Sequence, residues 1–374
     1  MMHSNNKNES DSPAAEPRPA SRRVFAASVV LLAIAVLLLI FSIMQTRRPA
    51  AGSQNGFLVQ GGQSPFYAAA GNGLAVATTD SIQLFASNGR CAASAQVESL
   101  SPVCSGSALL GIYYDLESSR IYALYPDGSR RETELDGTPL FADVNETGLA
   151  SVLWEKTDGR SCVMVYDTDL TPLFRWDAGV ALPLTARVSK DDILCVNCVS
   201  AEGGSLRFFR IDREDALGSY TAPGELILDF GFLSDGTVAA VTEDRLLLIR
   251  SGGELIAEHP FEGSHLSAFY LQGDFAAVAT ATGLSGGSEV LTTLDSAGQI
   301  LGSCSAPRNT QALSASGDRL LVLFTGEEAT LYSKTLQELV SYQPESDVTQ
   351  IFLCGDGMAF FTGASGVTQI DFSR

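Results

Sequence analysis

A pattern of two short hairpins recurs about every forty residues along this chain. One half of each copy is a turn followed by an apolar run, as in Asn72-Gly73 before LAVATT and Asp356-Gly357 before MAFFTG. The other half is an alternating run that leads into a second turn, as in IQLFASNGR from Ile82. A period of this length with four short strands per copy is typical of β-propeller blades. The sequence therefore predicts an all-β fold, an eight-bladed or alternatively a seven-bladed β-propeller.

The copies occupy nearly everything after residue 56 and predict one large domain, the propeller, over residues 56–374. The eighth copy supplies three strands and lacks a fourth. A ring with an unpaired edge invites aggregation, so we expect Phe57–Gln60 to complete the last blade. Aromatic residues near the ends of the third strands are expected to pack between blades: Phe85, Tyr125, Tyr166, Phe209 and Tyr332.

An apolar segment precedes the propeller. Val24–Met44 contains 21 residues, of which only Ser28 and Ser42 are polar. As a helix it would span about 30 Å, the thickness of the hydrocarbon core of a bilayer. It is longer than the apolar region of a signal peptide, and no small-residue cleavage site follows it. The segment predicts a single transmembrane helix that stays attached as a signal anchor.

The charges at the two ends of this segment predict its orientation. Four basic residues lie before it and only Arg47 and Arg48 lie directly after it, which favours a cytoplasmic N-terminus and an extracytoplasmic propeller at the plasma membrane. Residues 1–23 are polar and predict a disordered cytoplasmic tail, and residues 45–55 predict a flexible tether. The chain carries a net charge of −19, which argues against a nucleic-acid partner.

Acidic residues gather in the loops that join second to third strands. In a propeller these loops emerge on one face, so their carboxylates would give that face a negative field that attracts a cationic partner. The alternative is that they are ordinary solvated turns. The candidate binding residues are Asp80, Asp115, Glu117, Asp158, Glu202, Glu243, Asp244, Glu289, Glu327 and Glu328.

Motifs for chemistry are scarce. Cys195 and Cys198 have C-x-x-C spacing but lie within one strand-like run, so we expect them to point to opposite faces as buried thiols. His259 and His265 are near Glu258 and Glu262, but a transition-metal site needs three or four well-spaced ligands. No nucleophile or phosphate-binding motif is present. We therefore expect no catalytic residue, no metal and no cofactor.

The combination of tail, anchor and degenerate repeats over residues 24–374 resembles a poorly characterised family of membrane-anchored β-propeller proteins of Gram-positive bacteria. It is also similar, more distantly, to quinoprotein-like and WD-repeat-like propellers. The tryptophan docking motifs of the quinoproteins are absent, since the chain contains only Trp154 and Trp176. The resemblance implies a non-enzymatic binding or scaffold module in the cell envelope, with a protein, peptide or glycan partner. The alternative is an envelope glycan hydrolase or lyase that uses carboxylates in the propeller channel.

Overall fold

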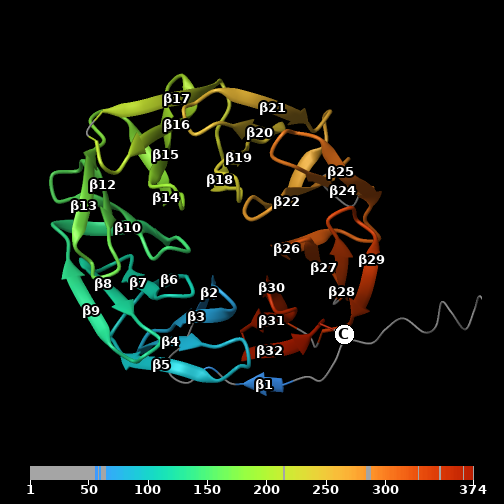
Figure 1. Cartoon of the computed structure of the whole chain (residues 1–374), viewed down its shortest axis with the longest axis horizontal. Coiled ribbons are helices and arrows are strands. Elements are labelled where there is room, and N and C mark those ends of the chain that lie inside the picture. The colour runs from blue at the N-terminus through green and yellow to red at the C-terminus, as the bar shows by residue number, and fades with distance from the viewer. Residues whose placement is uncertain are drawn as a thin grey trace, which may run out of the picture. The chain divides into compact units, whose positions relative to one another are not determined.

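A computed structural model describes residues 55–57, 59, 65–213, 215–283, 288–326, 328–344, 347–364 and 366–373. Their regular elements are all strands, which form sheets arranged around a ring (Figure 1). The chain is therefore an all-β protein with the architecture of a β-propeller. None of the described residues belongs to a helix that could cross a membrane. The predicted tail, anchor and most of the tether lie outside the described residues.

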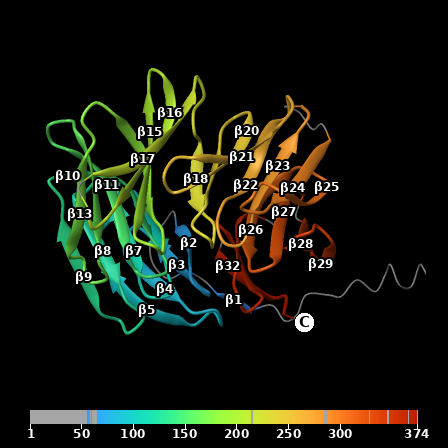
Figure 2. The same cartoon turned by 45° about the horizontal axis from the view of Figure 1, so that its top comes forward.

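The sheets are built from antiparallel four-stranded meanders, each of which begins at the centre of the ring and ends at its rim (Figures 1 and 2). The innermost strands are β2 (Phe66–Ala70), β6 (Pro102–Gly106), β10 (Gly137–Val144), β14 (Leu182–Val188), β18 (Asp229–Phe232), β22 (His265–Tyr270), β26 (Thr310–Ser316) and β30 (Val348–Leu353). The outermost strands are β5 (Cys91–Gln96), β9 (Arg130–Glu134), β13 (Pro172–Asp177), β17 (Ala216–Pro223), β21 (Leu255–Pro260), β25 (Ile300–Ser305), β29 (Glu338–Tyr342) and β1 (Asn55–Phe57).

The second and third strands of each meander coincide with the two halves of the sequence repeat. The second strands are β3 (Gly73–Ala77), β7 (Gly111–Asp115), β11 (Ala150–Lys156), β15 (Ile193–Ser200), β19 (Val238–Val241), β23 (Ala276–Ala281), β27 (Arg319–Phe324) and β31 (Met358–Gly363). The third strands are β4 (Ser81–Phe85), β8 (Arg120–Leu124), β12 (Ser161–Tyr166), β16 (Gly203–Arg210), β20 (Arg245–Ile249), β24 (Glu289–Leu294), β28 (Glu328–Ser333) and β32 (Gly366–Asp371). The continuous apolar runs become buried second strands because both of their faces are covered by neighbouring sheets.

Two of the meanders share one sheet. In the described residues there are six four-stranded sheets and one eight-stranded sheet, in which β2 and β6 are joined by a single parallel pair, Ala70 with Gly106. A side chain at residue 106 would place its Cβ 2.7 Å from the carbonyl oxygen of Ala69 and 2.7 Å from the Cβ of Ala70, so this close approach requires glycine. Counting sheets gives seven, whereas counting meanders gives eight.

The ring closes through its N-terminal strand. β1 pairs antiparallel with β32 and supplies the outer strand of the last meander. Phe57 stacks on Phe85 of the first meander with ring centroids 4.5 Å apart, and it contacts Phe360 of the last meander edge-on at 6.3 Å. The predicted closure is present, with the strand at Asn55–Phe57. Leu58 and Gln60, which belonged to the predicted strand, lie outside the described residues.

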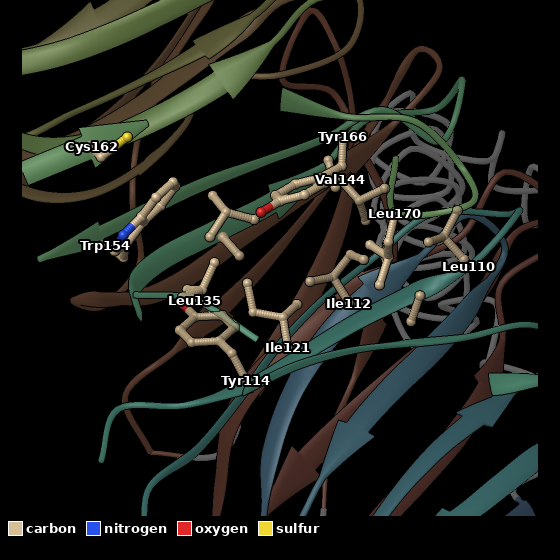
Figure 3. Packing of buried hydrophobic residues seen from close by; sticks show 14 residues of the cluster. Leu110, Ile112, Tyr114, Ile121, Leu135, Val144, Trp154, Cys162, Tyr166 and Leu170 are labelled. Carbon is tan, nitrogen blue, oxygen red and sulfur yellow. The ribbon is translucent and has the colours of Figure 1, made fainter. Parts of the chain in front are cut away.

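Apolar clusters between neighbouring meanders hold the sheets face to face. Figure 3 shows one of them, in which Ile112 and Ile121 of the second meander pack toward Val144 and Tyr166 of the third. Trp154 lies in the same cluster, and its indole N–H donates a 2.6 Å hydrogen bond to Asp136. Phe85, Tyr166, Phe209 and Tyr332 are buried in such clusters and Tyr125 packs against one, which confirms that these aromatics pack between blades.

All seven cysteines are unpaired. Cys195 and Cys198 are buried on opposite faces of β15: Cys195 packs against the fifth meander, and Cys198 packs toward the third. Burial raises the pKa of Cys198 to about 11. Of the seven thiols, Cys91 alone is exposed, at the start of the outer strand β5.

Candidate functional site

One face of the ring carries both the loops between second and third strands and the connections that lead from one meander to the next. Backbone hydrogen bonds join the two kinds of segment. Val97 N–H donates to Asp80 O, Thr157 N–H to Asp136 O, and Gly224 N–H to Glu202 O. We call this side the connection face. It consists of the strand loops 78–80, 116–119, 157–160, 201–202 and 242–244, the connections 97–101, 178–181 and 224–228, and their counterparts in the other meanders.

Six of the ten predicted acidic residues are exposed in loops of the connection face. They belong to the first five meanders and are Asp80, Glu117, Asp158, Glu202, Glu243 and Asp244. Asp158 forms an ion pair with Arg160 in its own loop. Glu202, Glu243 and Asp244 form no ion pair with the described basic residues. These three lie on the neighbouring fourth and fifth meanders, and Asp80 and Glu117 of the first two meanders form no ion pair with described basic residues either.

Asp115 does not belong to a binding surface, contrary to the sequence interpretation. It is buried, and its carboxylate accepts hydrogen bonds from the backbone N–H groups of Leu100, Ser101 and Glu117 at 2.8, 3.2 and 2.8 Å. Burial by itself would raise the pKa of Asp115, but these amide donors lower it below its usual value. The side chain fastens the connection between the first two meanders to the second, a structural role.

Glu289 is also buried rather than exposed. One of its oxygens accepts a 2.6 Å hydrogen bond from Thr310 N–H, which ties the sixth meander to the first strand of the seventh. Glu328 is half-buried and lies 3.7 Å from Arg308, and Glu327 lies outside the described residues. We therefore leave these three acidic residues and Asp115 out of the candidate surface.

The opposite face is acidic as well, but folding explains much of that charge. In several of its hairpin turns, an aspartate or asparagine accepts a hydrogen bond from the backbone N–H two residues later. Asp127, Asp235, Asp295 and Asp356 do so at 2.8 to 3.0 Å. These side chains stabilise turns. This turn role explains these four side chains but not the exposed Glu146, Asp191 and Asp318 of the same face.

A partly buried ionic cluster lies on the innermost strands of the second to fifth meanders. Arg187 of β14 donates to Asp229 of β18 at 2.6 Å and to the carbonyl of Phe230, and its guanidinium lies over the rings of Phe141 and Phe230 at 5.3 and 5.2 Å. Asp143 of β10 accepts a 3.1 Å hydrogen bond from the hydroxyl of Ser105 in β6.

The carboxyl of Asp143 has an altered acidity. Burial raises its pKa above the usual value, although Arg187 and the Ser105 hydroxyl oppose the shift. The cluster thus joins four consecutive meanders around one cation. The cluster was not predicted from the sequence because its partners are 38 to 44 residues apart, although that spacing is the repeat period itself.

Exposed leucines share the connection face with the acids. Leu140, Leu184 and Leu228 recur at intervals of 44 residues at the inner strands of the third, fourth and fifth meanders. Leu182 and Leu226 lie two residues before the second and third of these, and they are also exposed. Among the described loops of the opposite face, the one exposed large apolar side chain is Leu109. The regular interval was the signal that could have revealed these leucines.

Other candidate sites are weak. A small pocket lies between the first two meanders, beside Asp115, Tyr113 and Tyr114. Two of its polar groups are already occupied, since Asp115 binds backbone amides and the Tyr113 hydroxyl donates to Gln83 O at 2.7 Å. Within the described part of the chain, no three His, Cys, Asp or Glu side chains are grouped so that they could hold a metal ion.

Comparisons with known proteins agree with the fold. BamB from Moraxella catarrhalis superposes with a TM-score of 0.57 at 13% identity, over 87% of this chain and 98% of the other. The C-terminal WD40 domain of Sif2 gives 0.60 at 10% identity, over 86% and 97% of the two chains. The computationally designed Ika8 protein gives 0.64 at 16% identity, over 86% and 100%.

At these identities the structural likeness supports the propeller fold and nothing more specific. No curated protein matches the sequence. A family model, described as a family of unknown function (DUF5711), matches residues 57–371, which is nearly all of the propeller. The chain belongs to the DUF5711 family.

Proposed function

We propose that this protein is a membrane-anchored binding module of the cell envelope, whose connection face holds a basic protein or peptide. The observation that carries the proposal is the group of exposed acids without ion partners on the fourth and fifth meanders, Glu202, Glu243 and Asp244. Charges of one sign on a shared face raise the rate at which an oppositely charged partner associates. A glycan partner would gain less from this field, so a basic partner fits the face better.

The proposal includes the architecture predicted from the sequence. Val24–Met44 is the transmembrane anchor, with residues 1–23 in the cytoplasm and residues 45–55 as the tether. The propeller is extracytoplasmic and eight-bladed, with each meander counted as a blade because β2 and β6 share only one bridge pair. The module is not an enzyme and needs no cofactor, which agrees with the absence of catalytic motifs from the sequence.

The glycan hydrolase or lyase remains the second candidate. Asp143 and Asp229 favour it, because both lie on innermost strands and their charges interact across Arg187. A raised pKa on one carboxyl beside an ionised partner is the arrangement that such enzymes use. However, Asp229 contacts Arg187 through both oxygens, and Asp143 is held by Ser105. These contacts match a structural cluster better than a reactive pair.

Cys91 offers a direct test of topology. A membrane-impermeant maleimide added to intact spheroplasts should label the full-length protein, because Cys91 is the one exposed thiol and the propeller is expected outside. Burial raises the pKa of Cys91, so labelling should be slow at neutral pH and faster at pH 8.5. Cys91→Ser is the control and should remove most of the label. Labelling that appears only after lysis would place the propeller inside the cell.

Photo-crosslinking in cells tests the proposed binding face. A crosslinking amino acid at the exposed position Ala201, beside Glu202, should capture a basic envelope protein that mass spectrometry can identify. The same amino acid at Lys190, an exposed position on the opposite face, should not capture it. The triple variant Glu202→Gln, Glu243→Gln and Asp244→Asn should abolish the adduct at 201.

A charge-matched variant controls for the altered net charge. Glu146→Gln, Asp191→Asn and Asp318→Asn remove three exposed acids from the opposite face and should leave the adduct unchanged. If position 201 captures nothing, or if positions 201 and 190 capture the same proteins, the connection face is not the binding surface.

A further inference from the structure

We infer that the segment bound at the connection face is an amphipathic helix of a partner protein, with leucine-like residues along one side and lysine or arginine beside them. The inference rests on the proposed function, because it names the partner of the same face. It depends on a second feature of that face, the exposed leucines of the third to fifth meanders.

The leucines occupy one structural position. Leu140, Leu184 and Leu228 directly precede Phe141, Thr185 and Asp229, which pair in the same register with Leu153, Asn197 and Val241 of their second strands. In the third and fourth meanders the leucine is the extra residue of a β-bulge. A bulge turns a side chain out of the regular alternation. The repeat therefore places these leucines at equivalent positions in three consecutive meanders, at or just before the innermost strands.

Two further exposed leucines, Leu182 and Leu226, lie near these three, toward the connections between meanders. The exposed fractions of Leu140, Leu182, Leu184, Leu226 and Leu228 lie between 42% and 54%, whereas the leucines of the second strands are almost fully buried. Half-exposed leucines in this number leave a few hundred Å² of apolar surface, the size at which a patch on a soluble domain marks a binding surface. We call these five residues the leucine arc.

Glu202 lies directly beside the leucine arc. Gly224 N–H donates to Glu202 O at 2.9 Å and Gly204 N–H donates to Glu225 O at 2.7 Å, so the loop of Glu202 is bound to the connection that carries Leu226 and Leu228. Glu225 forms an ion pair with Arg245, whereas Glu202 has no basic partner among the described residues. An apolar strip thus runs next to unpaired negative charge.

A cationic amphipathic helix matches both features. Its apolar side chains at positions i, i+3, i+4 and i+7 would cover the leucine arc, and its flanking basic residues would meet Glu202, Glu243 and Asp244. Other occupants fit less well. An anionic lipid surface would be repelled by the acids, and a second copy of this chain carries the same large negative charge.

The test uses the full-length protein in phosphatidylcholine nanodiscs and a 14-residue amphipathic peptide of leucine and lysine as the probe. Binding is measured by surface plasmon resonance. The double variant Leu184→Ser and Leu228→Ser should weaken binding about tenfold or more, since it removes the apolar centre of the interface. The triple variant of Glu202, Glu243 and Asp244 described above should mainly slow association and flatten the dependence on salt.

Two controls distinguish specific binding at this site from nonspecific hydrophobic binding. Leu173→Ser with Leu217→Ser changes leucines that are 46% and 42% exposed on outer strands, and it should leave the affinity unchanged. A peptide of the same composition without an apolar side should bind all variants equally weakly. If the two leucine double variants bind the probe alike, the leucine arc is not its site.

The same variants distinguish this inference from the proposed function. If the crosslink at Ala201 persists in the Leu184→Ser and Leu228→Ser variant but is lost in the triple acid variant, the face binds a basic partner by charge and the amphipathic inference is wrong. If the triple acid variant keeps the crosslink, the proposed function itself fails.

Discussion

Replacing Arg187 with alanine should lower the free energy of unfolding by about 3–5 kcal/mol, the cost of leaving a buried charge without its partner. The guanidinium binds Asp229 and lies over Phe141 and Phe230, so its removal exposes two carboxylates to each other and opens a space between aromatic rings. Chemical denaturation followed by tryptophan fluorescence measures the loss. A change below about 1 kcal/mol would mean that the cluster does not hold the meanders together.

Asp143→Asn provides the contrast within the same cluster. Because the pKa of Asp143 is raised in the folded state, the unfolded chain ionises first as pH rises, so ionisation of this residue costs stability above the usual aspartate pKa. The asparagine variant should lose that part of the pH dependence. It should be as stable as the parent at neutral pH, or more stable, since its amide oxygen can still accept from Ser105. A variant as unstable as Arg187→Ala would contradict this account.

Phe57→Ala should have the second large effect, a loss of about 2–4 kcal/mol, because a large aromatic is removed from between the first and last meanders. The stacking on Phe85 and the edge contact with Phe360 disappear together. Hydrogen exchange measured by mass spectrometry should show faster exchange in β32, whose amides pair with β1, before the rest of the ring is affected.

Phe66→Ala is the matched control for the closing contact. It is the same change at a side chain that is 38% exposed at the start of β2, and we expect a smaller loss with no selective change in β32. If Phe57→Ala leaves the exchange of β32 unaltered, the N-terminal strand does not secure the ring.

The strands could be predicted from the sequence because the repeat carries two independent signals, turn residues and apolar runs. The opposite orientations of Cys195 and Cys198 could be predicted correctly because they follow from strand alternation alone. The closing strand could also be predicted, because a three-stranded final copy needs a partner. These inferences depend on local pattern and on the requirement that edges be paired.

The roles of individual acids could not be predicted in the same way. Asp80 lies in the loop after β3 and Asp115 is the last residue of β7, but only Asp115 is buried, where backbone N–H groups of the neighbouring connection and of Glu117 donate to it. Whether backbone N–H groups point at a carboxylate depends on the path of a segment that is distant from it in the sequence. Arg187 likewise resembles any strand residue until Asp229 and Asp143 are placed beside it by the ring.

The pairing of β1 with β32 also determines the order of folding during synthesis. The register joins Asn55 to Gln369. β1 is the first strand of the ring to leave the ribosome, and it can pair only after β32, the last one, has been synthesised. Until then the growing chain presents β1 and the newest meander as open edges, which are the places where strands of another copy can add. A circular permutant that begins at β2 and carries β1 after β32 would turn this distant pairing into a local hairpin. It would shorten the interval in which two nascent chains can exchange strands.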